Sequence, residues 1–427
     1  MNITTEQKDI FYKIAVASFI IYLFVDFFGV AVPFRPRIRD VEEIGTSNPL
    51  NQVIYPLLFL SSFICLLAGR LQVYKIIRRE KILTLFLIWC IASIAWSIDP
   101  GSTAKRVFRT VTLFSVTLSI LAYVTSTKDL LKYIKPILYL YVFSSVAVCL
   151  TIPGATDPQF HTWRGFAGHK NELGQVSVIC IFLSFFIFKQ EERYKKLIAA
   201  ASLTFSIALL FGSGSVTSIT SFLAVSGIGS VFLVDKIFKP IGLGRTVSIV
   251  IFLAIVGLVA SILFFASGIV ETLTNFAGKD VTFSGRTDLW AAMMYEISKH
   301  PYLGAGYQAF WSLDNPSALW LYEVFIWLPR QAHNGYIDIL NELGLIGFVI
   351  FLFSLIKYFF SIKKLREPHP WKWLIIATLI INLQESTLFR PGHLIGEIVV
   401  ISYFILFAQL LKQKSDEKKE IPPRKFY

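Results

Sequence analysis

The sequence predicts an all-α polytopic membrane protein with about twelve transmembrane helices and one large outer loop that contains short helices. Of its 427 residues, 55% are hydrophobic and only 16% are charged, whereas a soluble domain has about 25% charged residues. Apolar runs near 20 residues, long enough to cross a bilayer, recur along the chain. The 39 Phe and 9 Trp residues suit lipid contact and the interfacial belt. This composition excludes soluble, disordered, coiled-coil and disulfide-stabilised proteins.

The expected spans divide the chain into two membrane bundles separated by the large loop. The apolar runs lie at residues 13–33, 50–69, 82–98, 107–124, 136–153, 173–188, 197–211, 219–234, 247–268, 334–356, 373–389 and 396–411. The corresponding segments are a first bundle (1–268), the large loop (269–333), a second bundle (334–411) and a charged tail (412–427) that we expect to be disordered.

The basic residues predict the orientation of the chain in the membrane. The net charge is +13, from 41 Lys and Arg against 28 Asp and Glu. A basic chain can bind nucleic acid, but the positive-inside rule explains this excess better. With the N-terminus inside, the inner connections and the two termini hold 28 of the 41 basic residues. We therefore expect both termini to be cytoplasmic and no nucleic-acid partner.

Two pieces of the large loop are expected to be helical. In residues 286–300 the apolar side chains Leu289, Met293 and Ile297 recur four residues apart, which places them on one helical face. Pro301 ends this helix, and Gly304 to Gly306 form a tight turn. A second short helix is expected over residues 316–328, lying on or near the outer interface.

The start of the tenth expected span carries a polar stripe. Asn334 is a candidate N-cap, and Asp338, Asn341 and Glu342 follow at helical spacing on one face. Because polar side chains are costly against lipid, the stripe should face the bundle interior or a wet cavity. His333 at its outer end could take a proton from a hydroxyl. The alternative is a capping turn with an interfacial histidine.

Several cations gather on the outer side, where the positive-inside rule disfavours them. They are Arg164, Lys170, Arg286 and Arg330. Arginine matches phosphate geometry through its planar fork of donors, so their convergence beside a histidine predicts an anionic partner such as a lipid pyrophosphate. Each of them alone could instead snorkel to headgroups. His169, Lys170 and Asn171 precede a helix start and could bind the same partner.

The sequence contains no pattern that indicates a metal or a nucleotide cofactor. We find no HExxH motif, no phosphate-binding glycine loop and no DxD pair in an outer loop. The four cysteines lie in apolar runs without a CxxC pair. We therefore expect no metal and no cofactor. Asp26, Arg109, Glu385 and Glu397 are ionisable groups within or near spans, and each could be paired structurally.

In their order along the chain, six stretches resemble the O-antigen ligase and polymerase family of membrane proteins, and most closely its exopolysaccharide-production branch. They are AWSIDP (95–100), WRGFAGHKNELG (163–174), SGSVTS (213–218), SGRTDLW (284–290), HPYLGAGYQAF (300–310) and AHNGYIDILNELGLIG (332–347). By motif match, His333 takes the place of the histidine that acts near the acceptor hydroxyl, and Arg286 and Arg164 take the places of arginines that hold pyrophosphate. Val216 stands where many ligases carry a further cation, so Arg164 or Arg330 could supply the second phosphate contact.

The resemblance implies a bacterial inner-membrane glycosyltransferase with a large periplasmic loop. Such an enzyme would polymerise oligosaccharide units linked to undecaprenyl pyrophosphate into an exopolysaccharide or related surface glycan, without metal and with inversion. Its expected partners are the lipid-linked substrate, membrane lipid, and a flippase and chain-length regulator of the same pathway. The alternatives are a ligase that transfers finished glycan to lipid A-core or protein, and a flippase for lipid-linked oligosaccharide.

Overall fold

The computed structural model describes residues 4–29, 49–156, 162–239, 246–247, 250, 254, 286–325, 329–366 and 369–420. Within these residues the chain is helical, and its only β pairing is an isolated bridge between Thr156 and Trp163. The helices are α1 (Thr5–Phe28), α2 (Pro49–Ala68), α3 (Arg70–Arg79), α4 (Lys81–Ala92), α5 (Pro100–Leu121), α6 (Thr127–Thr151), α7 (Lys170–Gln190), α8 (Arg193–Gly212), α9 (Val216–Phe238), α11 (Arg286–Lys299), α12 (Pro316–Val324), α13 (Gly335–Ile362), α14 (Trp371–Ile381) and α15 (Leu394–Glu420).

The expectation of a multi-pass helical protein is confirmed. In the described residues, 7 helices are long and apolar enough to cross a membrane, and three shorter apolar helices accompany them. Every expected span except 247–268, which lies almost entirely outside the described residues, overlaps a helix. The total of twelve spans stays a prediction.

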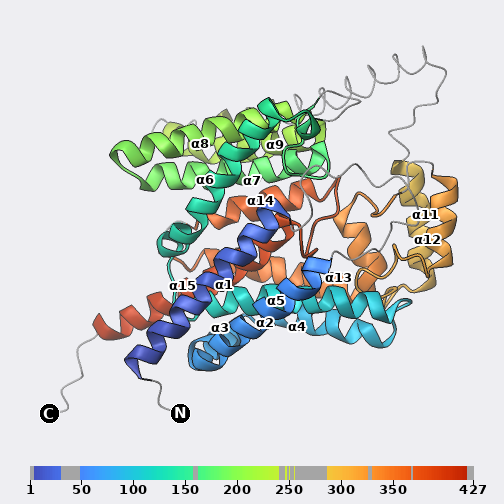
Figure 1. Cartoon of the computed structure of the whole chain (residues 1–427), viewed down its shortest axis with the longest axis horizontal. Helices are drawn as coiled ribbons and strands as arrows, with labels where there is room; N and C mark the ends of the chain where they lie inside the picture. Colours follow the sequence, from blue (N-terminus) through green and yellow to red (C-terminus); the bar gives the residue numbers. More distant parts are fainter. Residues whose placement is uncertain are drawn as a thin grey trace.

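The helices form two groups that α14 joins (Figure 1). In one group α7 and α8 pack closely with α6 and α9. In the other, α4 packs against α13, α5 packs against α15, and α2 packs against α1 and α5, while α14 packs against α7, α9 and α15. The apolar part of α15 is 89% buried, against 22% for α2. A helix that is hydrophobic all round is buried, so α15 lies at the centre of the bundle.

Two expectations for the C-terminal part need correction. The span expected at residues 373–389 is helical only as far as Ile381, because Asn382 leaves the helix and organises a polar turn. Its Oδ1 accepts hydrogen bonds from the backbone N–H groups of Thr387 at 2.7 Å and Leu388 at 3.0 Å. The tail expected to be disordered from residue 412 is helical up to Glu420, where α15 ends.

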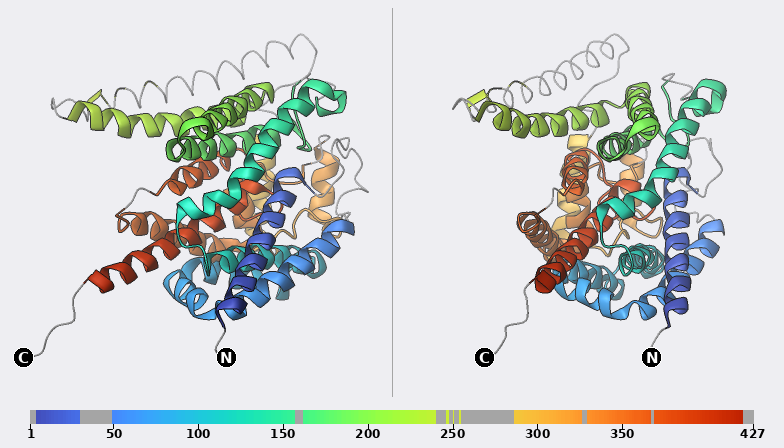
Figure 2. Two further views of the ribbon diagram at one scale, coloured as in Figure 1. Left: turned by 60° about the vertical axis from the view of Figure 1, so that its left-hand side comes forward. Right: turned by 90° about the vertical axis from the view of Figure 1, so that its left-hand side faces the viewer.

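The basic connections that we expected on the inner side lie together at one end of the molecule. Lys357 pairs with Glu80 at 2.8 Å, and Arg79 donates to the carbonyl of Leu410, near the end of α15, at 3.4 Å. The indole of Trp371 donates to Thr127 at 3.0 Å. The start of α1 and the end of α15 also lie at the same end (Figure 2).

The described part of the large loop forms a small unit with its own apolar core. Leu289, Met293, Phe310, Leu321 and Ala332 are among its buried residues. As predicted, α11 buries Leu289, Met293 and Ile297 and ends just before His300 and Pro301. The second helix, α12, ends at Val324 and is shorter than expected.

A break inside α13 attaches this unit to the bundle. Gly344 has φ +66°, and a Cβ there would lie 2.2 Å from the carbonyl oxygen of Tyr302. The break leaves the carbonyls of Asn341 and Glu342 without helical partners, and the backbone N–H groups of Ala305 and Gly306 donate to them at 2.8 and 2.9 Å. The first turns of α13 are thereby fixed against the turn at residues 304–306.

Candidate functional site

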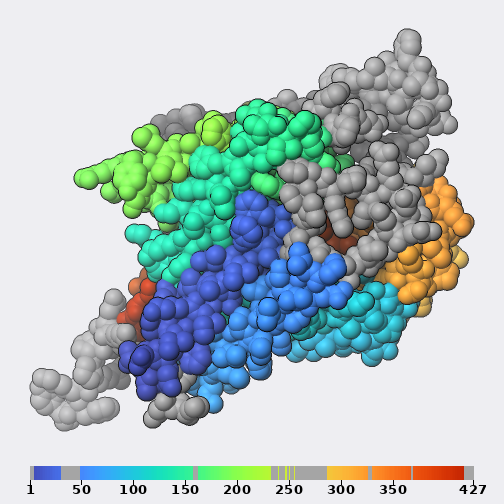
Figure 3. Space-filling view, in the orientation of Figure 1, coloured from blue at the N-terminus to red at the C-terminus, as the bar shows by residue number. Residues whose placement is uncertain are grey.

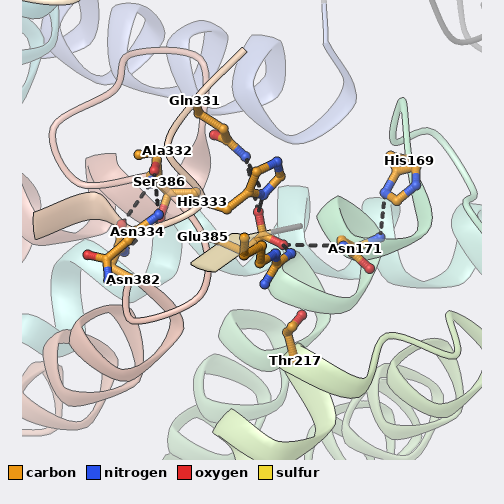
Figure 4. Close-up of polar contacts among 12 residues, drawn as sticks. His169, Asn171, Thr217, Gln331, Ala332, His333, Asn334, Asn382, Glu385 and Ser386 are labelled. Carbon is orange, nitrogen blue, oxygen red and sulfur yellow. Dashed lines mark hydrogen bonds and ion pairs between the residues drawn. The ribbon is translucent and has the colours of Figure 1, made fainter. Parts of the chain in front are cut away.

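The centre of the candidate site is Glu385, which lies in the polar turn between α14 and α15. Its side chain is only 4% exposed. Gln331 donates to its Oε2 at 3.1 Å, and the same oxygen lies 3.1 Å from His333 Nδ1. Asn171 donates to Oε1 at 3.2 Å, and a terminal nitrogen of Arg286 lies 3.4 Å from it. Figure 4 shows Gln331, His333 and Asn171 around this carboxylate.

Three helices begin at this cluster. Arg286 is the first residue of α11. Asn171 lies in the first turn of α7, where its backbone N–H donates to the capping His169 at 3.2 Å. Asn334 caps α13 by accepting from the backbone N–H groups of Tyr336 and Ile337. Helix N-termini carry partial positive charge, so this region favours a bound anion.

Glu385 is ionised in this setting. Burial alone would raise its pKa, but the hydrogen bond from His333 and the positive charges of His333, Arg286 and His169 outweigh burial and lower the pKa below 4.5. When His333 is neutral, the carboxylate can accept its Nδ1 proton, and the lone pair that can take a proton then lies on Nε2.

The backbone holds His333 in a conformation that L-residues rarely adopt. Its φ is +50°, in the left-handed region. The neighbouring peptides fix it there, since Ala332 N–H donates to Asp338 at 3.1 Å and Asn334 N–H donates to Ser386 at 3.1 Å. Such strain is typical of functional positions that the surrounding structure over-determines.

The polar stripe on α13 faces the interior, as predicted. Asp338 and Glu342 are both buried, and both bind the guanidinium of Arg390, at 3.0 and 2.7 Å. Asp338 also accepts from the indole of Trp311 at 3.2 Å. Asp338 and Arg390 therefore brace the segment that carries His333.

The remaining predicted cations lie in the surrounding segments. Arg164 is buried and donates from Nε to the carbonyl of Gly154 at 2.8 Å. Lys170 opens α7 directly before Asn171. Burial raises the pKa of Tyr322 to about 12, and Arg330 lies close enough for its positive charge to oppose that rise. Their role in phosphate binding stays a prediction.

The resemblance aligns a ligase cation with Val216, but the structure turns that side chain outward. Val216 is 44% exposed, while its neighbour Thr217 lies below Glu385 with its hydroxyl directed toward the cluster (Figure 4). A hydroxyl thus occupies the inner position of this turn.

Sequence reasoning missed the central role of Glu385, and it did not single out Gln331 or Arg390. Glu385 was noted only as an ionisable group near a span. The signal was the polar stretch from Asn382 to Thr387, followed by Pro391 and Gly392, which interrupts the apolar pattern. Gln331 was visible two residues before His333.

Comparison with known proteins agrees with the resemblance seen in the motifs. A family model described as O-Antigen ligase matches residues 200–352. The exopolysaccharide production protein ExoQ of Rhizobium meliloti is 28% identical over 246 residues, which cover 55% of this chain and 56% of the relative. The match therefore spans little more than half the length of that curated relative. Arg286, Arg330, His333 and Asp338 lie within the family segment, whereas Asn171 and Glu385 lie outside it.

The chain is a multi-pass membrane protein, and its resemblance to the O-antigen ligase and polymerase family is confirmed over residues 200–352 by the family model and over 55% of the chain by the similarity to ExoQ.

Proposed function

We propose that this protein is an inner-membrane glycosyltransferase that polymerises oligosaccharide units carried on undecaprenyl pyrophosphate into an exopolysaccharide or related surface glycan. The observation that carries the proposal is the Glu385 cluster, in which one buried carboxylate binds His333, Arg286, Gln331 and Asn171. It combines a candidate base with a candidate phosphate-binding cation, and these are the two functions that sugar transfer from a lipid pyrophosphate requires.

In the proposed reaction His333 acts as general base. Glu385 holds Nδ1 at 3.1 Å, so Nε2 takes the proton of the acceptor hydroxyl. The acceptor oxygen attacks the anomeric carbon, and the bond from that carbon to the phosphate oxygen breaks on the opposite face. The leaving lipid pyrophosphate keeps the bonding electron pair, and the anomeric configuration inverts.

Arg286 is proposed to stabilise the departing pyrophosphate. A single nitrogen of its guanidinium contacts Glu385, at 3.4 Å, and an arginine fork has five N–H donors in all. The positive end of α11 starts at the same residue. A preorganised cation and helix end that face a developing charge lower the barrier to its formation. Arg164, His169, Lys170 and Arg330 are proposed as further contacts to the donor, and Asn334 and Asp338 as residues that shape its binding site.

The arrangement of the chain suits a periplasmic reaction. The site lies where α7, α11 and α13 begin, and the basic connections gather with the termini at another end. We propose that both termini are cytoplasmic and that the site opens to the periplasm. The lipid-linked substrate, a flippase and a chain-length regulator are the proposed partners.

Ligation of finished glycan to lipid A-core or protein is the second candidate, because the matching family model is described as O-Antigen ligase. Products separate the two. Loss of a polymerase leaves single repeat units on the lipid carrier, whereas loss of a ligase leaves long chains on it. Loss of a flippase would instead leave single units on the cytoplasmic leaflet.

The proposal is tested by replacing His333 with Ala in purified protein supplied with lipid-linked repeat units. Chain growth should fall about 10²–10⁴-fold, the usual contribution of a general base. His300→Ala is the matched control, since His300 is exposed and directly follows α11. Undiminished growth in the His333 variant would remove the proposed base, and equal losses in both variants would contradict a specific role.

A further inference from the structure

A cavity of about 260 Å³ is lined by residues of α1 and α7 and of the turn before α15. It is enclosed by the end of α1, the first turns of α7 and the segment at residues 392–395. At roughly 30 Å³ per water its volume corresponds to about nine waters, which suits a single sugar ring but not an oligosaccharide. In Figure 3 the surface is hollowed beside the ends of α1 and α2, and residues in the C-terminal colours lie at the bottom of the hollow.

One wall of the cavity is aromatic. Phe27, Phe28, Tyr141 and Phe166 line it. The ring centroids of Phe28 and Phe166 are 5.1 Å apart, and those of Phe27 and Tyr141 are 5.2 Å apart. These mutual contacts hold the rings in place, so the wall presents a fixed apolar surface.

The other wall carries hydrogen-bonding groups, among them an unusual carboxylate. Asp26, Glu172, Gln175 and His393 line this side. Both carboxylate oxygens of Asp26 are buried, and neither has a hydrogen-bond partner in the part of the chain that the structure describes. Buried polar groups are nearly always hydrogen-bonded, so a hydrogen-bond donor bound in the cavity would satisfy a carboxylate that the described chain leaves without one.

The lining indicates the chemistry of that molecule. No lysine or arginine belongs to the lining residues of the described chain, so a phosphate would meet carboxylates instead of cations. A neutral molecule with several hydroxyl groups and one apolar face fits both walls. Its hydroxyls donate to the carboxylates, and its C–H face packs on the rings.

The cavity adjoins the proposed reaction centre. Glu172 directly follows Asn171, which binds Glu385. On the other side His393 lies close enough to Glu385, Arg390 and Arg109 for their charges to affect its pKa, which burial lowers to about 4. The cavity lining is thus connected to the proposed reaction centre through Glu172 on α7 and His393 in the turn before α15, while the members of the Glu385 cluster themselves lie outside the lining.

We propose that this cavity binds one neutral sugar residue of the glycan substrate, with Asp26 accepting hydrogen bonds from its hydroxyls and the aromatic wall packing on its C–H face. This assignment rests on the proposed function, which supplies the glycan. Asp26 is then a residue that sets sugar specificity.

The test is saturation-transfer NMR on the full-length protein with methyl glucopyranoside, methyl galactopyranoside and methyl mannopyranoside as probes. The protein is kept in a detergent without a sugar headgroup, since such a headgroup could occupy the cavity. We expect transfer to at least one glycoside, with loss of about tenfold or more in affinity in Asp26→Ala, because a hydrogen bond to a charged group is lost.

Two further variants complete the design. Val176→Phe fills the cavity from α7, where Val176 lines it, and should block the same probe. Asp9→Asn removes a carboxylate from the far end of α1, where it pairs with Lys13 on the surface, and should bind like the wild type. Monodisperse elution and an unchanged Tm identify the variants that fold. If Asp26→Ala does not fold, the binding measured for Val176→Phe tests the proposal.

Each outcome has a distinct meaning. If wild-type protein extends glycans but transfers saturation to none of the probes, or if Asp26→Ala and Val176→Phe bind like the wild type, the cavity assignment is overturned. Displacement of the glycoside by inorganic pyrophosphate would overturn the assignment of the cavity to a neutral ligand. A wild-type protein that binds the glycoside through Asp26 but transfers no sugar would refute the proposed function and leave the cavity assignment intact.

Discussion

At the residue scale, Glu385 determines the geometry of its neighbours. The same carboxylate contacts His333, which the proposal makes a base, and Arg286, which it makes a phosphate ligand. A change at Glu385 should therefore alter proton transfer and donor binding together. We class it as a positioning residue, because the proposed reaction brings it into contact with neither substrate.

Arg286 should contribute to donor use through its charge and its geometry. Replacement by Ala should weaken transition-state stabilisation by about 2–4 kcal/mol, and Lys should restore only part of it because it lacks the planar fork. The measurement is kcat/KM for the lipid-linked donor. Arg366→Ala is the control, since Arg366 pairs with Glu417 on the exposed surface. Full rescue by Lys would contradict a bidentate contact.

The ionised state of Glu385 should make the stability of the protein depend on pH. Its pKa in the folded protein lies below 4.5, so its contribution to stability is present above that value and is lost as the pH falls through the folded pKa. Between pH 5 and 3 the Tm of the wild type should fall more steeply than that of Glu385→Gln. Parallel curves would show that the folded protein does not favour the carboxylate.

At the element scale, the start of α13 is fitted closely to the turn that bears Glu385. The backbone N–H of Gly335 lies 2.9 Å from the carbonyl oxygen of Asn382 and 3.0 Å from that of Glu385. A Cβ at Gly335 would lie 2.3 Å from Asn382 Oδ1. The fully buried Asn382 cannot give way without moving the turn.

Gly335→Ala should therefore lower stability by about 1–3 kcal/mol through overpacking and reduce sugar transfer by displacing Glu385. Denaturant-free thermal unfolding and the chain-growth assay measure the two effects. Gly101→Ala is the control, because a Cβ at Gly101 meets only Asp99, at 3.7 Å. This substitution should leave the stability and the sugar transfer unchanged. A stable, active Gly335 variant would show that the turn can move without consequence.

The membrane-spanning helices were predictable because each carries a long apolar pattern, and α11 was found from three side chains four residues apart, whereas the short basic helix α3 was not predicted. The end of α14 was not predictable by the same means. Leu383 and Leu388 continue the apolar composition past Ile381, while the turn depends on hydrogen bonds that the Asn382 side chain accepts from backbone N–H groups five and six residues further on. His333 and Arg286 were identified individually, but their common partner follows the α14 break and required the fold.

At the scale of the whole molecule, the exposed tyrosines Tyr302 and Tyr194 offer a matched test of orientation. They are 65% and 66% exposed, and Tyr302 lies in the large loop while Tyr194 lies in a basic connection. The natural cysteines Cys65, Cys90, Cys149 and Cys180 are all buried. In intact cells a membrane-impermeant maleimide should label Tyr302→Cys, and it should label Tyr194→Cys only after permeabilisation. The reverse pattern would contradict the proposed orientation.

The break between α14 and α15 limits how far the protein can be shortened. Residues 200–352 match the family, yet a fragment with those bounds would contain His333 and Arg286 without the carboxylate that aligns them and without the amide of Asn171. Such a fragment would keep the family motifs but would lack the residues that position His333 and Arg286. Truncation from the C-terminal side should therefore abolish sugar transfer once it removes the buried α15, and the loss of the turn that bears Glu385 follows, long before it reaches the matched segment.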